Sequence, residues 1–185
     1  EIAAILASIL LFWPVPLLAT QILWINLVTD TLPAIALGVD PGEKDIMKRK
    51  PRDPKESFFA HGAGTRAVLG GILIGFITLA AFYLGLHEHG YSPGSAGVPA
   101  EVTAYARTMA FMVLAASQLF YSLAMRSAHR SIFQVGLTTN KLLLGSLAAG
   151  LLVNALLIYV PFLADAFKLQ RLMPADWGVV LALSL

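Results

Sequence analysis

Long, mainly apolar segments separated by polar segments dominate this chain of 185 residues. Four of these segments cover about residues 18–39, 67–86, 104–125 and 142–163, each close to the ~20 residues that a helix needs to cross a bilayer. Two further apolar segments, residues 1–18 and the stretch from about Trp177 to the end, are short or cut off. The pattern predicts an all-α, polytopic helical membrane bundle of about six transmembrane segments, with the first and last truncated. We therefore expect residues 1–185 to be a fragment of a longer chain.

The composition agrees with a membrane protein. Hydrophobic residues make up 57% of the chain and charged residues 13%, whereas soluble domains carry roughly 25% charged residues. The chain has no cysteine, which excludes disulfides and thiolate metal sites within it. The formal net charge of +2 does not indicate nucleic-acid binding, because the basic residues lie in loops beside the apolar segments. We expect the lipid bilayer, and no nucleic acid, as a partner.

The distribution of Lys and Arg predicts which loops face the cytoplasm. The polar loop of residues 40–64 contains nearly half of the basic residues, and short loops rich in Lys and Arg lie on the cytoplasmic side. Residues 87–103 contain neither Lys nor Arg and are predicted to lie on the outer side. The basic residues of the predicted cytoplasmic side are Lys44, Lys48, Arg49, Lys50, Arg52, Lys55, Arg66, Arg126, Arg130 and Lys141.

A polar stretch interrupts the second apolar segment. Asn26, Thr29 and Asp30 are spaced i, i+3 and i+4, so an α-helix would place all three on one face. Because an ionisable side chain near the middle of a bilayer costs about 2.5–3.5 kcal/mol, Asp30 needs a partner, and a cation is the natural one. Pro33 has no N–H to donate to the carbonyl of Thr29. Side-chain and main-chain oxygens then lie at one depth, as in the interrupted helices with which transporters bind cations.

Two polar residues of other segments are candidate partners of this stretch. Glu1 lies at a depth that a tight hairpin would bring opposite Asn26 and Asp30. Gln118 lies midway along the fourth long segment, where its amide could ligate a cation or form a hydrogen bond between helices. The chain's metal candidates are therefore Glu1, Asn26, Thr29, Asp30 and Gln118.

Three other features favour structural roles. Gly71 and Gly75 form a GxxxG pair, which allows close helix packing. Asn154 lies in the 142–163 segment and is predicted to contribute to helix packing. His87, Glu88 and His89 resemble a metal cluster, but their spacing is poor for chelation, and we expect a solvated loop.

The ligand types indicate a hard cation, because all are oxygens. Calcium accepts six to eight oxygen ligands in irregular geometry, whereas magnesium gives up its water reluctantly. The chain contains no P-loop, no nucleophile with a paired base and no His-rich zinc motif. A secondary transporter or a channel with an interrupted helix is an alternative class, but the inverted repeat common in secondary transporters is not evident.

Longer motifs show a resemblance to a known family. Residues 21–30, QILWINLVTD, with the following LPA and ALG, closely resemble the sixth transmembrane helix of P-type calcium-transporting ATPases. Residues 45–47, DIM, and 51–56, PRDPKE, resemble the cytoplasmic loop after that helix. A weaker resemblance extends to the end of the chain. It identifies residues 1–185 with the membrane region from the end of the fifth helix to the start of the tenth.

The resemblance implies a function as well as a fold. It implies ATP-driven calcium export by a pump of ten membrane helices, whose cytoplasmic domains bind ATP and Mg²⁺ and carry a phosphorylated Asp outside this segment. By position, Asn26, Thr29 and Asp30 match ion ligands of the sixth helix, and Glu1 matches a carboxylate of the fifth. Gln118 stands where reticulum-type pumps have glutamate and plasma-membrane-type pumps have glutamine. We expect an integral protein of a bacterial plasma membrane, partnered by the other helices and the cytoplasmic domains of its pump.

Overall fold

A computed structural model describes residues 1–40, 57, 59, 62–95, 97–126, 134 and 136–185. These residues form helices and no strands, which confirms the predicted all-α fold. Most of the 40–64 loop, with its basic residues from Lys44 to Lys55, lies outside the described residues, as does Arg130. The helices are α1 (Ile2–Leu10), α2 (Ala19–Trp24), η1 (Ile25–Thr29), α3 (Thr31–Gly38), α4 (Ala63–His87), α5 (Ala100–Ala124), η3 (Leu137–Thr139), α7 (Lys141–Tyr159), α8 (Pro161–Phe167) and α9 (Pro174–Ser184).

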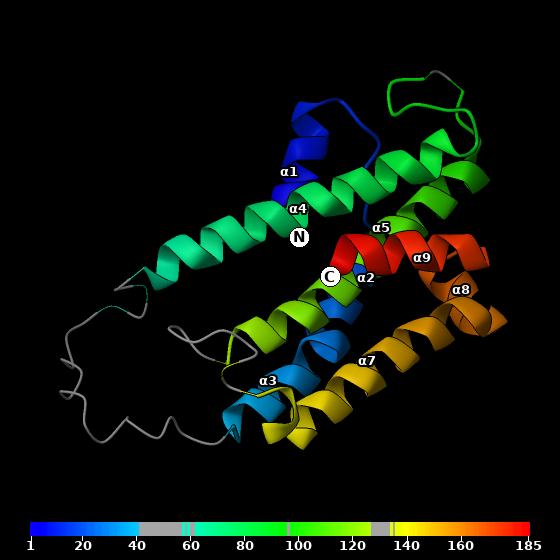
Figure 1. Ribbon diagram of the computed structural model, residues 1–185. Coiled ribbons are helices and arrows are strands. Elements are labelled where there is room, and N and C mark those ends of the chain that lie inside the picture. The colour runs from blue at the N-terminus through cyan, green and yellow to red at the C-terminus, as the bar shows by residue number, and fades with distance from the viewer. Residues whose placement is uncertain (41–56, 58, 60–61, 96, 127–133, 135) are drawn as a thin grey trace.

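Three helical segments among the described residues are long and apolar enough to cross a membrane: Ala19–Gly38, Ala63–His87 and Lys141–Tyr159. α5 also has 25 residues but is less apolar than α4. It runs through the middle of the bundle, between α4 and α7 (Figure 1). Its residues from Thr108 to Ser117 are all buried. A helix covered by protein on every side needs no lipid-facing stripe, which explains why α5 tolerates more polar residues than α4.

Prolines shift the predicted boundaries at the C-terminal end. The segment predicted to run to about residue 163 ends as α7 at Tyr159, and α8 begins at Pro161. Val160 is extended, with φ −86° and ψ 111°, because the residue before a proline avoids helical dihedrals. The last helix begins at Pro174 rather than near Trp177, since proline is well suited to the first turn of a helix.

Small residues bring the helices into close contact. Of the GxxxG pair, Gly75 lies at such a contact and Gly71 does not. A Cβ atom added at Gly75 would lie 3.0 Å from the Cβ of Ala3 on α1, whereas one at Gly71 would meet nothing within 4 Å. A Cβ at Gly85 would lie 2.7 Å from the Cα of Ala106 on α5. Gly75 therefore allows α1 to pack closely against α4, and Gly85 allows α4 to pack closely against α5.

One end of the bundle is held by an ion pair. The guanidinium of Arg126, directly after α5, donates from Nε and Nη2 to the two carboxylate oxygens of Asp40, at 3.0 and 2.9 Å. It also donates to the carbonyl of Gly136 at 2.8 Å. Asn140 donates to Asp40 Oδ1 and to the carbonyl of Ala36, both at 2.9 Å. These contacts, here called the Arg126 cluster, join the ends of α3, α5 and α7.

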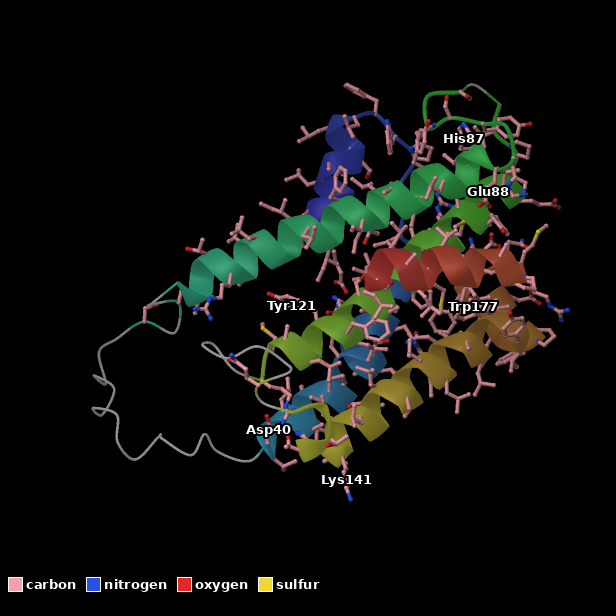
Figure 2. The ribbon with its side chains drawn as sticks, in the orientation of Figure 1. Asp40, His87, Glu88, Tyr121, Lys141 and Trp177 are labelled. Carbon is pink, nitrogen blue, oxygen red and sulfur yellow. The ribbon has the colours of Figure 1, made fainter. Side chains whose placement is uncertain are left out.

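The opposite end carries a pair of carboxyl groups, and Figure 2 shows one of them, Glu88, at the other end of the bundle from Asp40. Asp176 of α9 is buried, and one of its oxygens accepts hydrogen bonds from the Tyr105 hydroxyl and, at 2.6 Å, from the Met173 N–H. The Glu88 carboxyl, directly after α4, contacts that of Asp176. We call these residues the Glu88 cluster. It joins the ends of α4, α5 and α9.

Candidate functional site

The interrupted helix is widened around the polar stretch. Residues Ile25–Thr29 form a π-helical turn, in which the N–H of Asp30 donates to the carbonyl of Ile25 at 2.9 Å. Single π-helical turns inside α-helices occur frequently at functional sites. The N–H of Ala34 donates to the carbonyl of Asp30 at 3.1 Å, and Pro33 has no N–H to donate to Thr29. The helix does not break at Pro33, which lies in the first turn of α3.

Glu1 lies beside this turn, at the start of α1. Its Oε2 accepts a hydrogen bond of 3.0 Å from the side-chain amide of Asn26, and its charge acts on Asp30. Its second oxygen, Oε1, is buried and has no hydrogen-bond partner. A buried acceptor without a partner costs about 1–3 kcal/mol, so this oxygen is suited to binding a cation or a donor.

Gln118 and Asp30 face one another across a cavity. The cavity has a volume of about 260 Å³, and α3 and α5 form its walls. The Oε1 atom of Gln118 is also buried without a hydrogen-bond partner. Asp30 and Gln118 share this cavity with six other residues, namely Pro33, Ala34, Leu37, Tyr121, Ser122 and Met125. The two unpartnered oxygens and the Asp30 carboxylate thus come from three different parts of the chain.

Thr29 departs from the arrangement that α-helical spacing predicts. Its side chain is buried and contacts Asn154 of α7, whose Nδ2 donates to Thr29 Oγ1 at 3.3 Å. Asn26 turns instead to Glu1, and Asp30 to the cavity with Gln118. The predicted single face is therefore not formed, because the π-helical turn changes the angle between successive side chains. From the sequence, Asn154 was expected to contribute to helix packing; its amide within an apolar helix is the signal that could have indicated a polar partner.

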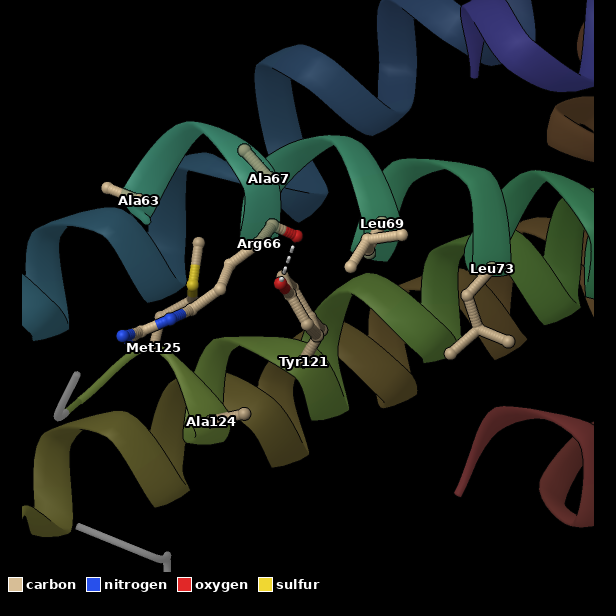
Figure 3. Close-up of a pocket in the computed structure, with 9 residues that line it drawn as sticks. Ala63, Arg66, Ala67, Leu69, Leu73, Tyr121, Ala124 and Met125 are labelled. Carbon is tan, nitrogen blue, oxygen red and sulfur yellow. Dashed lines mark hydrogen bonds between the residues drawn. The ribbon is translucent and has the colours of Figure 1, made fainter. Parts of the chain in front are cut away.

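Another cavity of the described bundle is larger than the one that Asp30 and Gln118 share, and its lining has different chemistry. It measures about 590 Å³ and lies between the first half of α4 and the end of α5 (Figure 3). Its lining is mostly apolar and contains Arg66 and Tyr121, but no carboxylate. The hydroxyl of Tyr121 donates to the Arg66 carbonyl at 3.5 Å. A cavity with a cationic side chain and no carboxylate is not suited to binding a metal ion.

The histidine-rich turn after α4 is not a metal site either. Among the described residues, no group of three His, Cys, Asp or Glu side chains is placed to hold a metal ion. The ring of His87 stacks on Tyr83 with centroids 5.8 Å apart, and the ring of His89 packs edge-on against Tyr105 at 4.7 Å. His87, Glu88 and His89 are all exposed, as expected of a solvated turn, and the two rings also contact neighbouring aromatic side chains.

The fold and site define a class of protein. Polar side chains from separate helices lie beside a π-helical turn inside a helical bundle, an arrangement expected of an integral membrane protein that handles cations. Residues 14–185 match the family described as "Cation transporting ATPase, C-terminus". The chain belongs to this family.

Individual relatives extend the comparison over the whole chain. It is 42% identical to Calcium-transporting ATPase 1 of Bacillus cereus and 41% identical to Calcium-transporting ATPase of Bacillus subtilis, in both cases over 100% of the chain. It is 30% identical to Calcium-transporting ATPase type 2C member 1 of Homo sapiens over 95% of the chain. The chain covers 21%, 19% and 18% of these relatives respectively, about one fifth of their length.

Proposed function

We propose that this chain is the membrane part of an ATP-driven calcium export pump and supplies ligands for the transported ion. The observation that carries the proposal is the pair of buried, unpartnered oxygens of Glu1, which contacts Asn26, and of Gln118, which shares a cavity with Asp30. The three relatives described above are all calcium-transporting ATPases, which supports the proposal. Calcium is the substrate; ATP and Mg²⁺ would be bound by cytoplasmic domains of the same protein, outside these residues.

The proposed ligand set combines charged and neutral oxygens. Glu1 and Asp30 provide negative charge, Asn26 and Gln118 provide amide oxygens, and Thr29 provides its carbonyl, to which Pro33 cannot donate. Two carboxylates with neutral oxygens suit a divalent ion, and a mixed set from a flexible helix turn tolerates the irregular geometry of calcium. The other helices of the pump would complete the coordination shell, and the bacterial plasma membrane is the proposed location.

The ligand role is tested by Asp30→Asn in the full-length protein. The substitution keeps the shape of the side chain and removes its charge, so we expect calcium-dependent phosphorylation to be lost. Phosphorylation is measured at increasing calcium concentrations on protein purified in detergent. Asp165→Asn, at an exposed carboxylate on α8, is the matched control and should behave like the wild type. Normal calcium dependence of Asp30→Asn would refute the proposal.

A further inference from the structure

Asn154 makes contacts that depend on the π-helical turn. Its Oδ1 accepts a hydrogen bond of 3.2 Å from the indole Nε1 of Trp24, and its Nδ2 lies 3.3 Å from Thr29 Oγ1. The same Nδ2 donates to the Gly150 carbonyl at 2.8 Å, which fixes the amide against α7. Asn154 is 1% exposed. A single buried amide thus contacts both Trp24, directly before the turn, and Thr29, its last residue.

These two contacts are incompatible with a regular α-helix. Trp24 and Thr29 are five residues apart, and at 3.6 residues per turn their side chains would point about 140° away from each other. A π-helical turn contains more residues per turn, which brings positions i and i+5 to the same side. Here the main chain makes the corresponding i to i+5 hydrogen bond, from Asp30 to Ile25. Asn154 can therefore reach both side chains only while the turn is π-helical.

The π-helical turn also decides where the side chain of Asp30 points. Reverting one π-helical turn to α-helical hydrogen bonding moves the following residues by one position, a rotation of about 100° around the helix axis. Such a rotation would move Asp30 away from the cavity that it shares with Gln118. We infer that Asn154 is a positioning residue of the cation site, which stabilises the π-helical turn and thereby directs Asp30 toward Gln118. This inference rests on the proposed function.

The test is Asn154→Leu in the full-length protein, because leucine has a similar volume but no hydrogen-bonding group. We expect the calcium concentration for half-maximal phosphorylation to rise roughly 10–100-fold, the usual cost of losing a residue that orients a ligand. The maximal rate should stay within about twofold of the wild type, since Asn154 lies outside the cation-facing cavity. Ser146→Ala is the matched control, because Ser146 is buried on the same helix and its hydroxyl donates only to the Leu143 carbonyl of α7.

A second variant keeps the test decisive if Asn154→Leu does not fold. Trp24→Phe keeps an aromatic ring at this position but removes the indole N–H that Asn154 binds, together with part of the ring, and it should also raise the half-maximal calcium concentration. The double variant should lose little more than Asn154→Leu alone, because both act on one contact. Unchanged calcium affinity in either single variant would overturn the inference. If Asp30→Asn also leaves calcium dependence normal, the proposed function itself fails; if only Asn154→Leu and Trp24→Phe are normal, the inference alone fails.

Discussion

The two ends of the bundle hold their helices together by opposite electrostatic means. In the Arg126 cluster, a guanidinium binds both oxygens of Asp40, and this pairing lowers the pKa of the Asp40 carboxyl. In the Glu88 cluster, one carboxyl meets another: burial and the charge of Asp176 raise the pKa of Glu88, while His89 opposes the shift. The folded state is thus stabilised at one end by the ionised form of Asp40 and at the other end by the protonated form of Glu88.

The difference means that acid acts on the two ends in opposite directions. Because the folded-state pKa of Asp40 lies below its ordinary value of 3.8, the stabilisation from Arg126 is present above that value and is lost as the pH falls through the lowered pKa. The pKa of Glu88 lies above its ordinary value of 4.5, so its stabilisation is present below 4.5 and is lost as the pH rises through the raised pKa. Lowering the pH therefore weakens the Arg126–Asp40 pair and favours the protonated form of Glu88.

Removing the guanidinium of Arg126 should have the largest effect on the stability of the fold. Arg126→Met leaves the Asp40 carboxylate without its cation, and we expect a loss of about 1.5–3 kcal/mol, the usual contribution of a hydrogen bond to a charged group. The measurement is the thermal unfolding midpoint of the full-length protein in detergent, at neutral pH. Lys141→Met, at an exposed residue of the same end, should have little effect. Adding Asp40→Asn to Arg126→Met should recover part of the loss; additive losses would show that the pair does not act as a unit.

Removing one hydroxyl at the other end should have a smaller effect. Tyr105→Phe deletes the donor to the buried Asp176 carboxylate while keeping the ring. We expect a loss of about 1–3 kcal/mol, at the lower end of this range because the Met173 N–H still donates to the same oxygen. The unfolding midpoint measures it, with Tyr91→Phe as a control at a tyrosine of the same end that is not part of the cluster. An unchanged midpoint would show that the Tyr105 hydroxyl does not support α9.

Neutralising Glu88 should have the smallest effect on the unfolding midpoint, and it should raise the midpoint rather than lower it. Glu88→Gln removes a charge that acts unfavourably on Asp176, so the unfolding midpoint should rise slightly at neutral pH, and the gain should shrink as the pH falls and Glu88 of the wild type binds its proton. Glu101→Gln, at an exposed residue in the first turn of α5, is the control and should not raise the midpoint. A lower unfolding midpoint for Glu88→Gln at neutral pH would show that the charge of Glu88 does not destabilise this end of the bundle.

The clusters differ from the membrane helices in how far they could be predicted. The span at residues 67–86 was expected from apolar length and is found as α4, Ala63–His87. Arg126 and Asp40 are 86 positions apart, and nothing in the local pattern links them. From the sequence, Arg126 indicated only the side of the membrane that its loop faces. The contact of Asp176 with Tyr105, in a different helix, was likewise not foreseeable.

The sequence by itself determined the all-α membrane fold, the approximate spans and the residue types of the proposed cation site. It could do so because bilayer thickness and the cost of buried polar groups act on each segment separately. Only the tertiary structure decided how those residues are arranged. The π-helical turn, the separation of Thr29 from Asp30 and the contact of Asn154 with Trp24 depend on α7 packing beside the interrupted helix. Such contacts join residues that are more than one hundred positions apart, and local periodicity carries no information about them.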